Sequence, residues 1–104
     1  MAWNGTQYTI TATAAKLSTI LGLNAADLKR FKQIDIKNAS GAANVLYLGP
    51  STVTNVPANA RVELSAGQAY SFDPGGGAFH VSTEEIFLVG TANAANIAFI
   101  SLLD

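Results

Sequence analysis

The 104-residue sequence has no cysteine and only one histidine, His80. Without cysteine the chain has no disulfide, no thiolate metal site and no cysteine nucleophile. A lone histidine also argues against a zinc site, because such sites draw three or four ligands mostly from histidine and cysteine. We expect His80 to be a hydrogen-bonded structural residue.

Charge is scarce as well. Lys, Arg, Asp and Glu make up 12% of the chain, against about 25% in an average soluble domain. With a net charge of -1, the chain offers no basic surface to nucleic acid or to an anionic membrane. Weakly charged monomers tend to self-associate, and the centres of permanent interfaces are poor in charge. We therefore expect much of the surface to be buried in an assembly; an ordinary, weakly charged β domain is the alternative.

Long apolar runs and reactive residue groups are missing too. No run approaches the roughly 20 apolar residues that span a bilayer, and the start, MAWN, lacks the pattern of a secretion signal. The glycine run 75–77 is followed by an apparent strand, whereas a phosphate loop needs a helix there. Glu84 and Glu85 are strand neighbours that point to opposite faces, unlike a glycosidase pair. We expect a soluble, non-enzymatic protein with no cofactor, no small-molecule substrate and no membrane partner.

What the sequence has in quantity is apolar residues at every second position. In the stretch 31–49, FKQIDIKNASGAANVLYLG, Ile34 and Ile36 alternate in a first run, and Leu46 and Leu48 alternate in a second. Each run is typical of a strand with one buried face. Two such runs around a glycine-containing loop predict a β-hairpin.

Further runs extend the same pattern along the chain. Alternation over 7–15, 61–64 and 69–72 predicts half-exposed strands. The runs 86–90 and 97–103 are almost continuously apolar, which predicts a last hairpin covered on both faces. One cover would be the second sheet, and the other a neighbouring subunit.

Seven or eight short strands separated by Gly, Pro or Asn turns are typical of a sandwich or jelly roll. We predict an all-β, single-domain β-sandwich with a jelly-roll-like arrangement over residues 7–104. Leucines at near-helical spacing predict one or two short helical turns near residues 16–30. Residues 1–6 are expected to form an N-terminal arm or to lead into a strand.

Four aromatic residues are candidates for an interface with another protein: Trp3, Tyr47, Tyr70 and Phe79. Trp3 in the arm either contacts a neighbouring chain or folds back onto its own core, since tryptophan is common at interface centres. Tyr47 and Tyr70 are the two aromatic platforms that a sugar site would use.

Five segments of the chain carry a resemblance to a known group of proteins: TATAAKLSTILGL, IDIKNAS, VLYLGPSTVT, VELSAGQAYSFD and IFLVGTANAANIAFISLL. Together they resemble the small β-sandwich virion proteins of tailed bacteriophages, most of all the capsid decoration, or cement, proteins. The shared pieces mark turns and core strands over residues 8–103, and they identify no catalytic residue.

The resemblance implies a structural protein of the virion, assembled in the host cytoplasm and located on the capsid surface. Its expected partners are the major capsid protein and further copies of itself, with a homotrimer favoured over a dimer. Similar modules occur in phage fibres and in head or tail accessory proteins. The alternative function is therefore a carbohydrate- or receptor-binding module of a fibre or accessory protein.

Overall fold

The computed structural model describes residues 3–24, 30–40, 44–54, 59–73, 81–91 and 96–103. Antiparallel strands dominate these residues, with one short helix, α1 (Leu17–Ile20), among them. The strands are β1 (Trp3–Ile10), β2 (Ala15–Lys16), β3 (Arg30–Phe31), β4 (Gln33–Asn38), β5 (Leu46–Gly49), β6 (Val62–Leu64), β7 (Ala69–Phe72), β8 (Val81–Ser82), β9 (Phe87–Gly90) and β10 (Asn96–Leu103).

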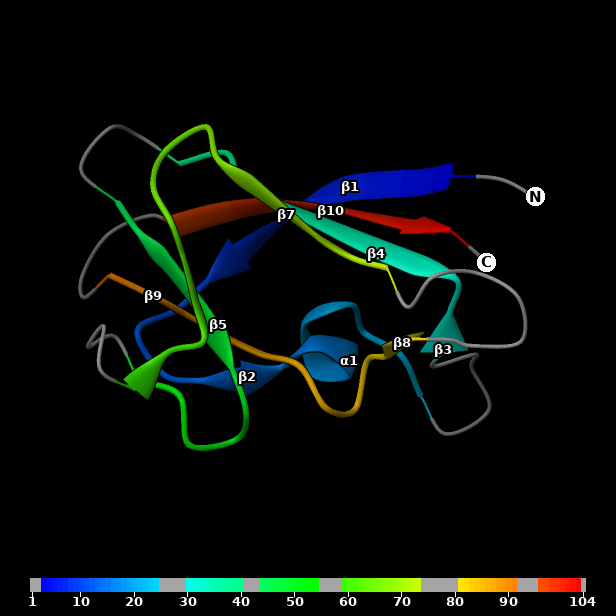
Figure 1. The fold of residues 1–104 in the computed structure, drawn as a ribbon, viewed down its shortest axis with the longest axis horizontal. Coiled ribbons are helices and arrows are strands. Elements are labelled where there is room, and N and C mark those ends of the chain that lie inside the picture. Colours follow the sequence, from blue (N-terminus) through cyan, green and yellow to red (C-terminus); the bar gives the residue numbers. More distant parts are fainter. Residues whose placement is uncertain are drawn as a thin grey trace.

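The strands pair in a nested order. β1 pairs with β10, β2 with β9, β3 with β8, β4 with β7, and β5 with β6, always antiparallel. The chain is thus one long two-stranded ribbon, folded in half at the connection between β5 and β6. At its other end Trp3 pairs with Leu103, which brings the N- and C-terminal strands side by side (Figure 1).

Rolling of this ribbon produces two sheets. β10 also lies beside β4, and β9 beside β5. Sheet A therefore has the order β1-β10-β4-β7, and sheet B the order β2-β9-β5-β6. The β3–β8 pair is a separate two-stranded sheet at one end of the sandwich (Figure 1). A rolled antiparallel ribbon of this order is a jelly roll, so the predicted all-β sandwich is confirmed.

The core lies between the inner faces of the two sheets. Ile34 and Ile36 of β4 are fully buried from one side, and Leu46 and Leu48 of β5 from the other. These are the four residues whose inward orientation the alternation predicted. The main cluster consists of Ile10, Leu17, Phe31, Ile34, Ile36, Leu46, Leu48, Leu64, Ile86, Leu88, Ala98 and Ile100.

Neither predicted hairpin is present. β4 and β5 lie in different sheets, and so do β9 and β10. Each connection crosses from one sheet to the other. Alternation shows that a strand has one buried face, but it does not show which strand is its neighbour. Here β4 and β5 bury their apolar faces against each other across the core instead of pairing edge to edge.

A buried asparagine ties the two sheets together where β4 ends. The Asn38 side chain is fully buried, and its Nδ2 donates to the carbonyl oxygens of Leu64 at 2.8 Å and Asn44 at 3.0 Å. Its Oδ1 accepts from the Ser40 N–H at 2.9 Å. Leu64 belongs to sheet B and Asn38 to sheet A, so this amide fixes the distance between the sheets at that point.

Two hydroxyls bond backbone groups beside the crossings. Ser40 Oγ accepts from the Ile97 N–H at 2.6 Å and donates to the Ile97 carbonyl at 3.2 Å. Thr91 Oγ1 accepts from the Val45 N–H at 2.7 Å and donates to the Val45 carbonyl at 3.0 Å. Thr91 Oγ1 bonds both backbone groups of Val45, and Ser40 Oγ bonds the Ile97 N–H and shares the Ile97 carbonyl with the Ala39 N–H. Leaving such backbone groups unpaired would be costly.

The N-terminal segment, which was expected to be an arm or to lead into a strand, is part of β1 from Trp3 onward. β1 begins at Trp3 and pairs with β10 along its whole length, so the expected boundary at residue 7 is not a boundary of secondary structure. The strand ends at Ile10, short of residue 15, because Thr11 Oγ1 bonds the Thr13 backbone N–H and C=O and forms a turn. α1 supplies one of the predicted helical turns; a second, over 25–29, lies outside the described residues.

Replacing Asn38 by alanine tests its role in joining the sheets. Asn38→Ala leaves the buried Leu64 carbonyl without its 2.8 Å donor, so the free energy of unfolding should fall by about 1–3 kcal/mol. Asn59→Ala is the matched control. The Asn59 amide is exposed and donates to Thr54 Oγ1, so this variant should lose less than about 0.5 kcal/mol of unfolding free energy. Urea unfolding measures both, and equal losses would contradict the assigned role.

Candidate interaction surfaces

The outer faces of the two sheets differ in what covers them. On sheet B, Tyr47 and Val89 are paired neighbours, and Val53 from the β5–β6 connection packs on them. All three are buried, with Tyr47 9% exposed. On sheet A, Phe99 of β10 is 38% exposed, and nothing comparable covers it in the part of the chain that the structure describes. Both apolar runs were predicted to need a neighbouring subunit as cover; for β9 the chain's own loop provides it.

The exposed side of sheet A around Phe99 forms one continuous surface, which we name the Phe99 face. The strand register places its residues in two adjacent rows across the sheet: Gln7, Phe99, Lys37 and Ala69, then Gly5, Ser101, Asp35 and Ser71. Only Lys37 and Asp35 are charged, and they have opposite sign. Phe99 is the one large apolar residue in these two rows, and its direct neighbours are Gln7 and Lys37. Exposed aromatic residues are enriched at protein interfaces.

A glycine holds the Phe99 ring in place. A Cβ atom on Gly5 would lie 2.9 Å from both Cε1 and Cζ of Phe99, and 2.9 Å from Ser101 Oγ. The ring therefore lies against the bare backbone of β1, which is the close approach that a strand glycine permits. Because the ring is positioned by its own sheet, it can meet a partner without first being ordered.

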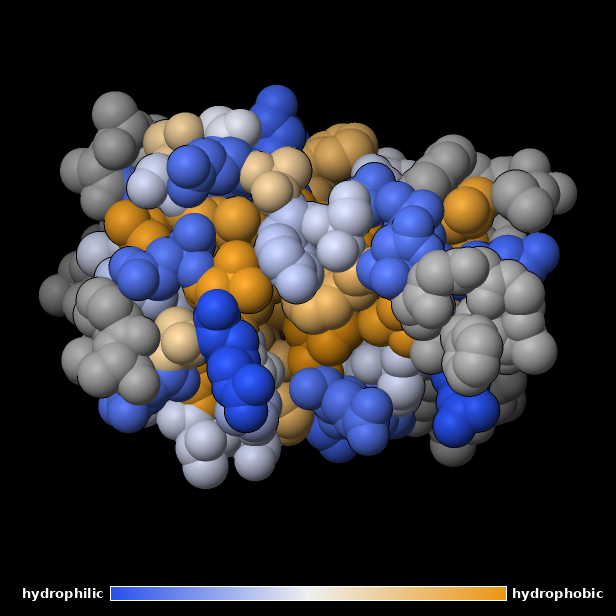
Figure 2. All heavy atoms as spheres, viewed as in Figure 1, coloured by the Kyte–Doolittle hydropathy of each residue, from blue (hydrophilic) through white to orange (hydrophobic). Residues whose placement is uncertain are grey.

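A second surface is an apolar groove beside β7, which we name the β7 groove. Leu48 and Ile86 are its buried residues, Val62 lies on the β6 side, and Tyr70 and Phe72 lie on the β7 side. The rings of Tyr70 and Phe72 meet edge to face, with centroids 4.9 Å apart. Figure 2 shows the apolar surface exposed between the two sheets in this view.

The size of the β7 groove limits what it can hold. Its volume is about 260 Å³, below the roughly 300–1,000 Å³ of most small-molecule sites. Arg61 and Glu85 also line it and add one charge of each sign. The groove suits one or two side chains of a protein partner, or a single sugar ring stacked on Tyr70.

The structure places the predicted interface residues differently from one another. Tyr70 is 42% exposed, so a partner can reach it, and its role at an interface stays a prediction. Tyr47 is corrected: it is buried under Val53, because its strand is covered on both faces. The Trp3 side chain and Phe79 lie outside the described residues. Phe99 was missed, because residues 97–103 are almost continuously apolar and their sequence does not separate the buried side from the exposed side.

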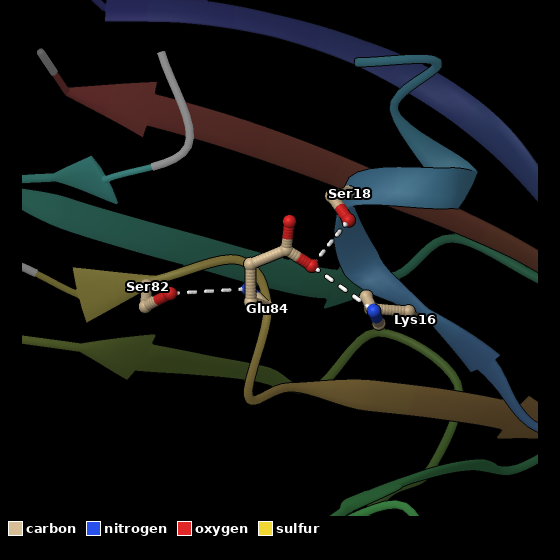
Figure 3. Close-up of polar contacts among 4 residues, drawn as sticks. All are labelled: Lys16, Ser18, Ser82 and Glu84. Carbon is tan, nitrogen blue, oxygen red and sulfur yellow. Dashed lines mark hydrogen bonds and ion pairs between the residues drawn. The ribbon is translucent and has the colours of Figure 1, made fainter. Parts of the chain in front are cut away.

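Glu84 belongs to a structural cluster (Figure 3). Its Oε2 accepts from Ser18 Oγ at 3.1 Å and lies 3.2 Å from Lys16 Nζ, while its N–H donates to Ser82 Oγ at 3.2 Å. These contacts attach β2 and α1 to the turn after β8. Glu85, in contrast, is exposed and lines the β7 groove, so the two adjacent carboxylates face different surroundings.

The described residues contain no group of three or more His, Cys, Asp or Glu arranged to hold a metal ion. His80 and the glycines 75–77 lie outside them. No helix in the described ranges is long and apolar enough to cross a membrane.

Comparison with known proteins shows similarity of fold alone. No family model and no curated protein sequence matches the chain. A protein of the disulfide-linked pili of Bacillus endospore appendages matches at a TM-score of 0.50 and 17% identity, over 99% of this chain and 87% of that chain. The Tobacco streak virus coat protein, solved as a dimer, matches at a TM-score of 0.46 and 14% identity, over 98% and 85% of the two chains.

Two tyrosine truncations separate a buried from an exposed position. Tyr47→Ala empties a site under Val53 and should lower the free energy of unfolding by about 2–5 kcal/mol. Tyr70→Ala removes a ring that is 42% exposed and should cost less than about 1.5 kcal/mol, mostly from the lost contact with Phe72. Denaturant midpoints that rank the two variants the other way would show that the outer face of sheet B is not covered as described.

Proposed function

We propose that this chain is a structural virion protein, and more specifically a capsid decoration protein that binds the shell of a tailed phage. The observation that supports this proposal is the uncovered Phe99 face. Sheet A fills the core with its inner side and presents the Phe99 ring, which lies against Gly5 and between Gln7 and Lys37, on its outer side. A surface of that kind is suited to a flat contact with another protein.

The mechanism is the burial of this face against the major capsid protein. One contact around Phe99 is small, but a shell offers the same contact many times. Linked copies on such a repeating surface bind far more tightly than one copy does. Bridging neighbouring capsid subunits in this way would reinforce the shell against pressure from within. The jelly roll fits the proposal, since viral capsid domains use this fold, but the fold does not fix the function.

Self-association belongs to the proposal, with a trimer favoured. The chain contains no cysteine, so its copies cannot be joined by disulfides as the Bacillus appendage pili are. Non-covalent burial of weakly charged surface would have to hold them together. We further propose that the protein has no catalytic activity, no cofactor and no nucleic-acid partner, and that it is located at the capsid surface after assembly in the host cytoplasm.

A second candidate function, recognition of a carbohydrate, is favoured by one observation. Tyr70 exposes its ring beside Arg61 and Glu85 in the β7 groove, and an aromatic platform with charged neighbours is what a sugar site uses. Glycan binding that Tyr70→Ala abolishes and Phe99→Ala leaves intact would support this function over shell binding.

Shell binding by a Phe99→Ala variant tests the main proposal. Shells of the major capsid protein from the genome that encodes this chain are mixed with the variant, and co-sedimentation is measured. Loss of the central aromatic ring should weaken binding about tenfold or more. Glu63→Ala, an exposed change on sheet B, should bind like the wild type. Unchanged binding by the folded Phe99→Ala variant would contradict the proposed contact face.

A further inference from the structure

The four edge strands of the sandwich are not equally protected. The edges of sheet B are β2, of two residues with Lys16, and β6, of three residues with Glu63. Short length and charge are the usual devices that stop an edge strand from pairing with another chain. Sheet B therefore has both edges blocked.

The edge strands of sheet A are longer than those of sheet B and carry no charge. β1 is eight residues long and β7 is four, and neither contains a charged residue or a proline. Gly5, Thr6 and Gln7 of β1 are exposed, as are Tyr70 and Ser71 of β7. In the part of the chain that the structure describes, β1 pairs only with β10 and β7 only with β4. Both margins of this sheet thus present backbone groups that a further strand can bond.

Strand direction decides how two copies fit. All neighbours in sheet A are antiparallel, so β1 runs opposite to β7. The β1 strand of a second copy, placed beside β7 in the same orientation, continues the alternation and forms an antiparallel ladder. The second copy does not need to be turned over. Neither of these two edge strands carries a charged residue into the contact, whereas any contact with β2 or β6 brings Lys16 or Glu63 to the interface.

The β7 groove gives the added strand an apolar surface to cover. Tyr70 and Phe72 lie on the inner side of sheet A, because they pair with Ile36 and Ile34. Thr6 and Tyr8 of β1 also lie on the inner side, since they pair with Ile100 and Ala98. In a continuous sheet, the inner side chains of the incoming β1 would therefore lie next to Tyr70 and Phe72, over a groove of about 260 Å³.

From this we infer that the copies assemble head to tail, with β1 of one copy added to the free edge of β7 of the next. The inference rests on the structural, self-associating role proposed above and names the partner surface as a second copy of this chain. A contact between two different patches closes into a ring, such as a trimer, or continues as a filament. In either arrangement the outer side of sheet A, with Phe99, remains free to meet the shell.

Two variants that each block one edge provide the test. Thr6→Lys/Gln7→Lys blocks β1, and Tyr70→Lys/Ser71→Lys blocks β7; all four positions are exposed. Light scattering at micromolar concentration should give the mass of more than two chains for the wild type and the mass of one chain for each variant. An equal mixture of the two variants should give the mass of a dimer, because the intact β1 of the β7-blocked variant can still pair with the intact β7 of the β1-blocked variant. Thr13→Lys/Thr19→Lys, also exposed and away from both edges, should assemble like the wild type.

Several results would overturn the inference. The inference is wrong if the wild type has the mass of a single chain, or if either blocked variant assembles by itself. If the β7-blocked variant dimerised by itself, β1 would be pairing with β1. These masses are measured without shells, so they fail independently of the shell-binding test with Phe99→Ala: a monomeric wild-type chain that binds shells would leave the decoration role standing.

Cross-linking gives a second measurement that does not depend on the charged variants folding. Gln7 and Ala69 lie three strands apart in one row of sheet A, about 14 Å, which is too far for a disulfide within one chain. In this cysteine-free chain, oxidised Gln7→Cys/Ala69→Cys should form multimers through bonds between copies, and neither single-cysteine variant should do so. Dimers from Gln7→Cys alone, or no multimers from the pair, would contradict the inference.

Discussion

The nested antiparallel pairing of the chain is the constraint on which the rest of the structure depends. Counted in strands, the first pairs with the last, the second with the last but one, and so on inward. Trp3 meets Leu103 at the open end of the ribbon. Once the inner pairs have formed, each outer pair closes only a short additional loop, which limits the entropic cost. β1 and β10, which form the outermost pair, also provide Gly5 and Phe99. The proposed contact surface therefore exists only when the ribbon is closed along its whole length.

The two sheets share one core but face different surroundings. Sheet B has its outer side covered by Val53 and its edges occupied by Lys16 and Glu63. Sheet A has an exposed Phe99 and uncharged edges. Asn38 bonds across from one sheet to the other, so the position of the exposed sheet is fixed by buried hydrogen bonds. This difference in cover and in edge charge between the two sheets is the physical basis for assigning assembly to sheet A.

The sequence alone predicted the strands and the core but not the pairing. Period-two alternation placed Ile34, Ile36, Leu46 and Leu48 correctly, because burial of one face is a property of each strand by itself. The choice of partner depends on the whole ribbon, and so the two expected hairpins were wrong. Tyr47 was expected on the surface because the cover by Val53 comes from a loop that has no periodic pattern. The roles of Asn38 and Gly5 depend on neighbours that are distant in sequence, and no local signal identifies them.

Amide hydrogen exchange, compared between the free chain and the assembled protein, tests most directly whether sheet A is the assembly surface. The account predicts that assembly slows exchange at the edge strands β1 and β7, where backbone N–H groups gain partners, and leaves β2 and β6 unchanged. The contradicting result is new protection confined to β2, β6 and the connection after β5, which would place the assembly surface on sheet B.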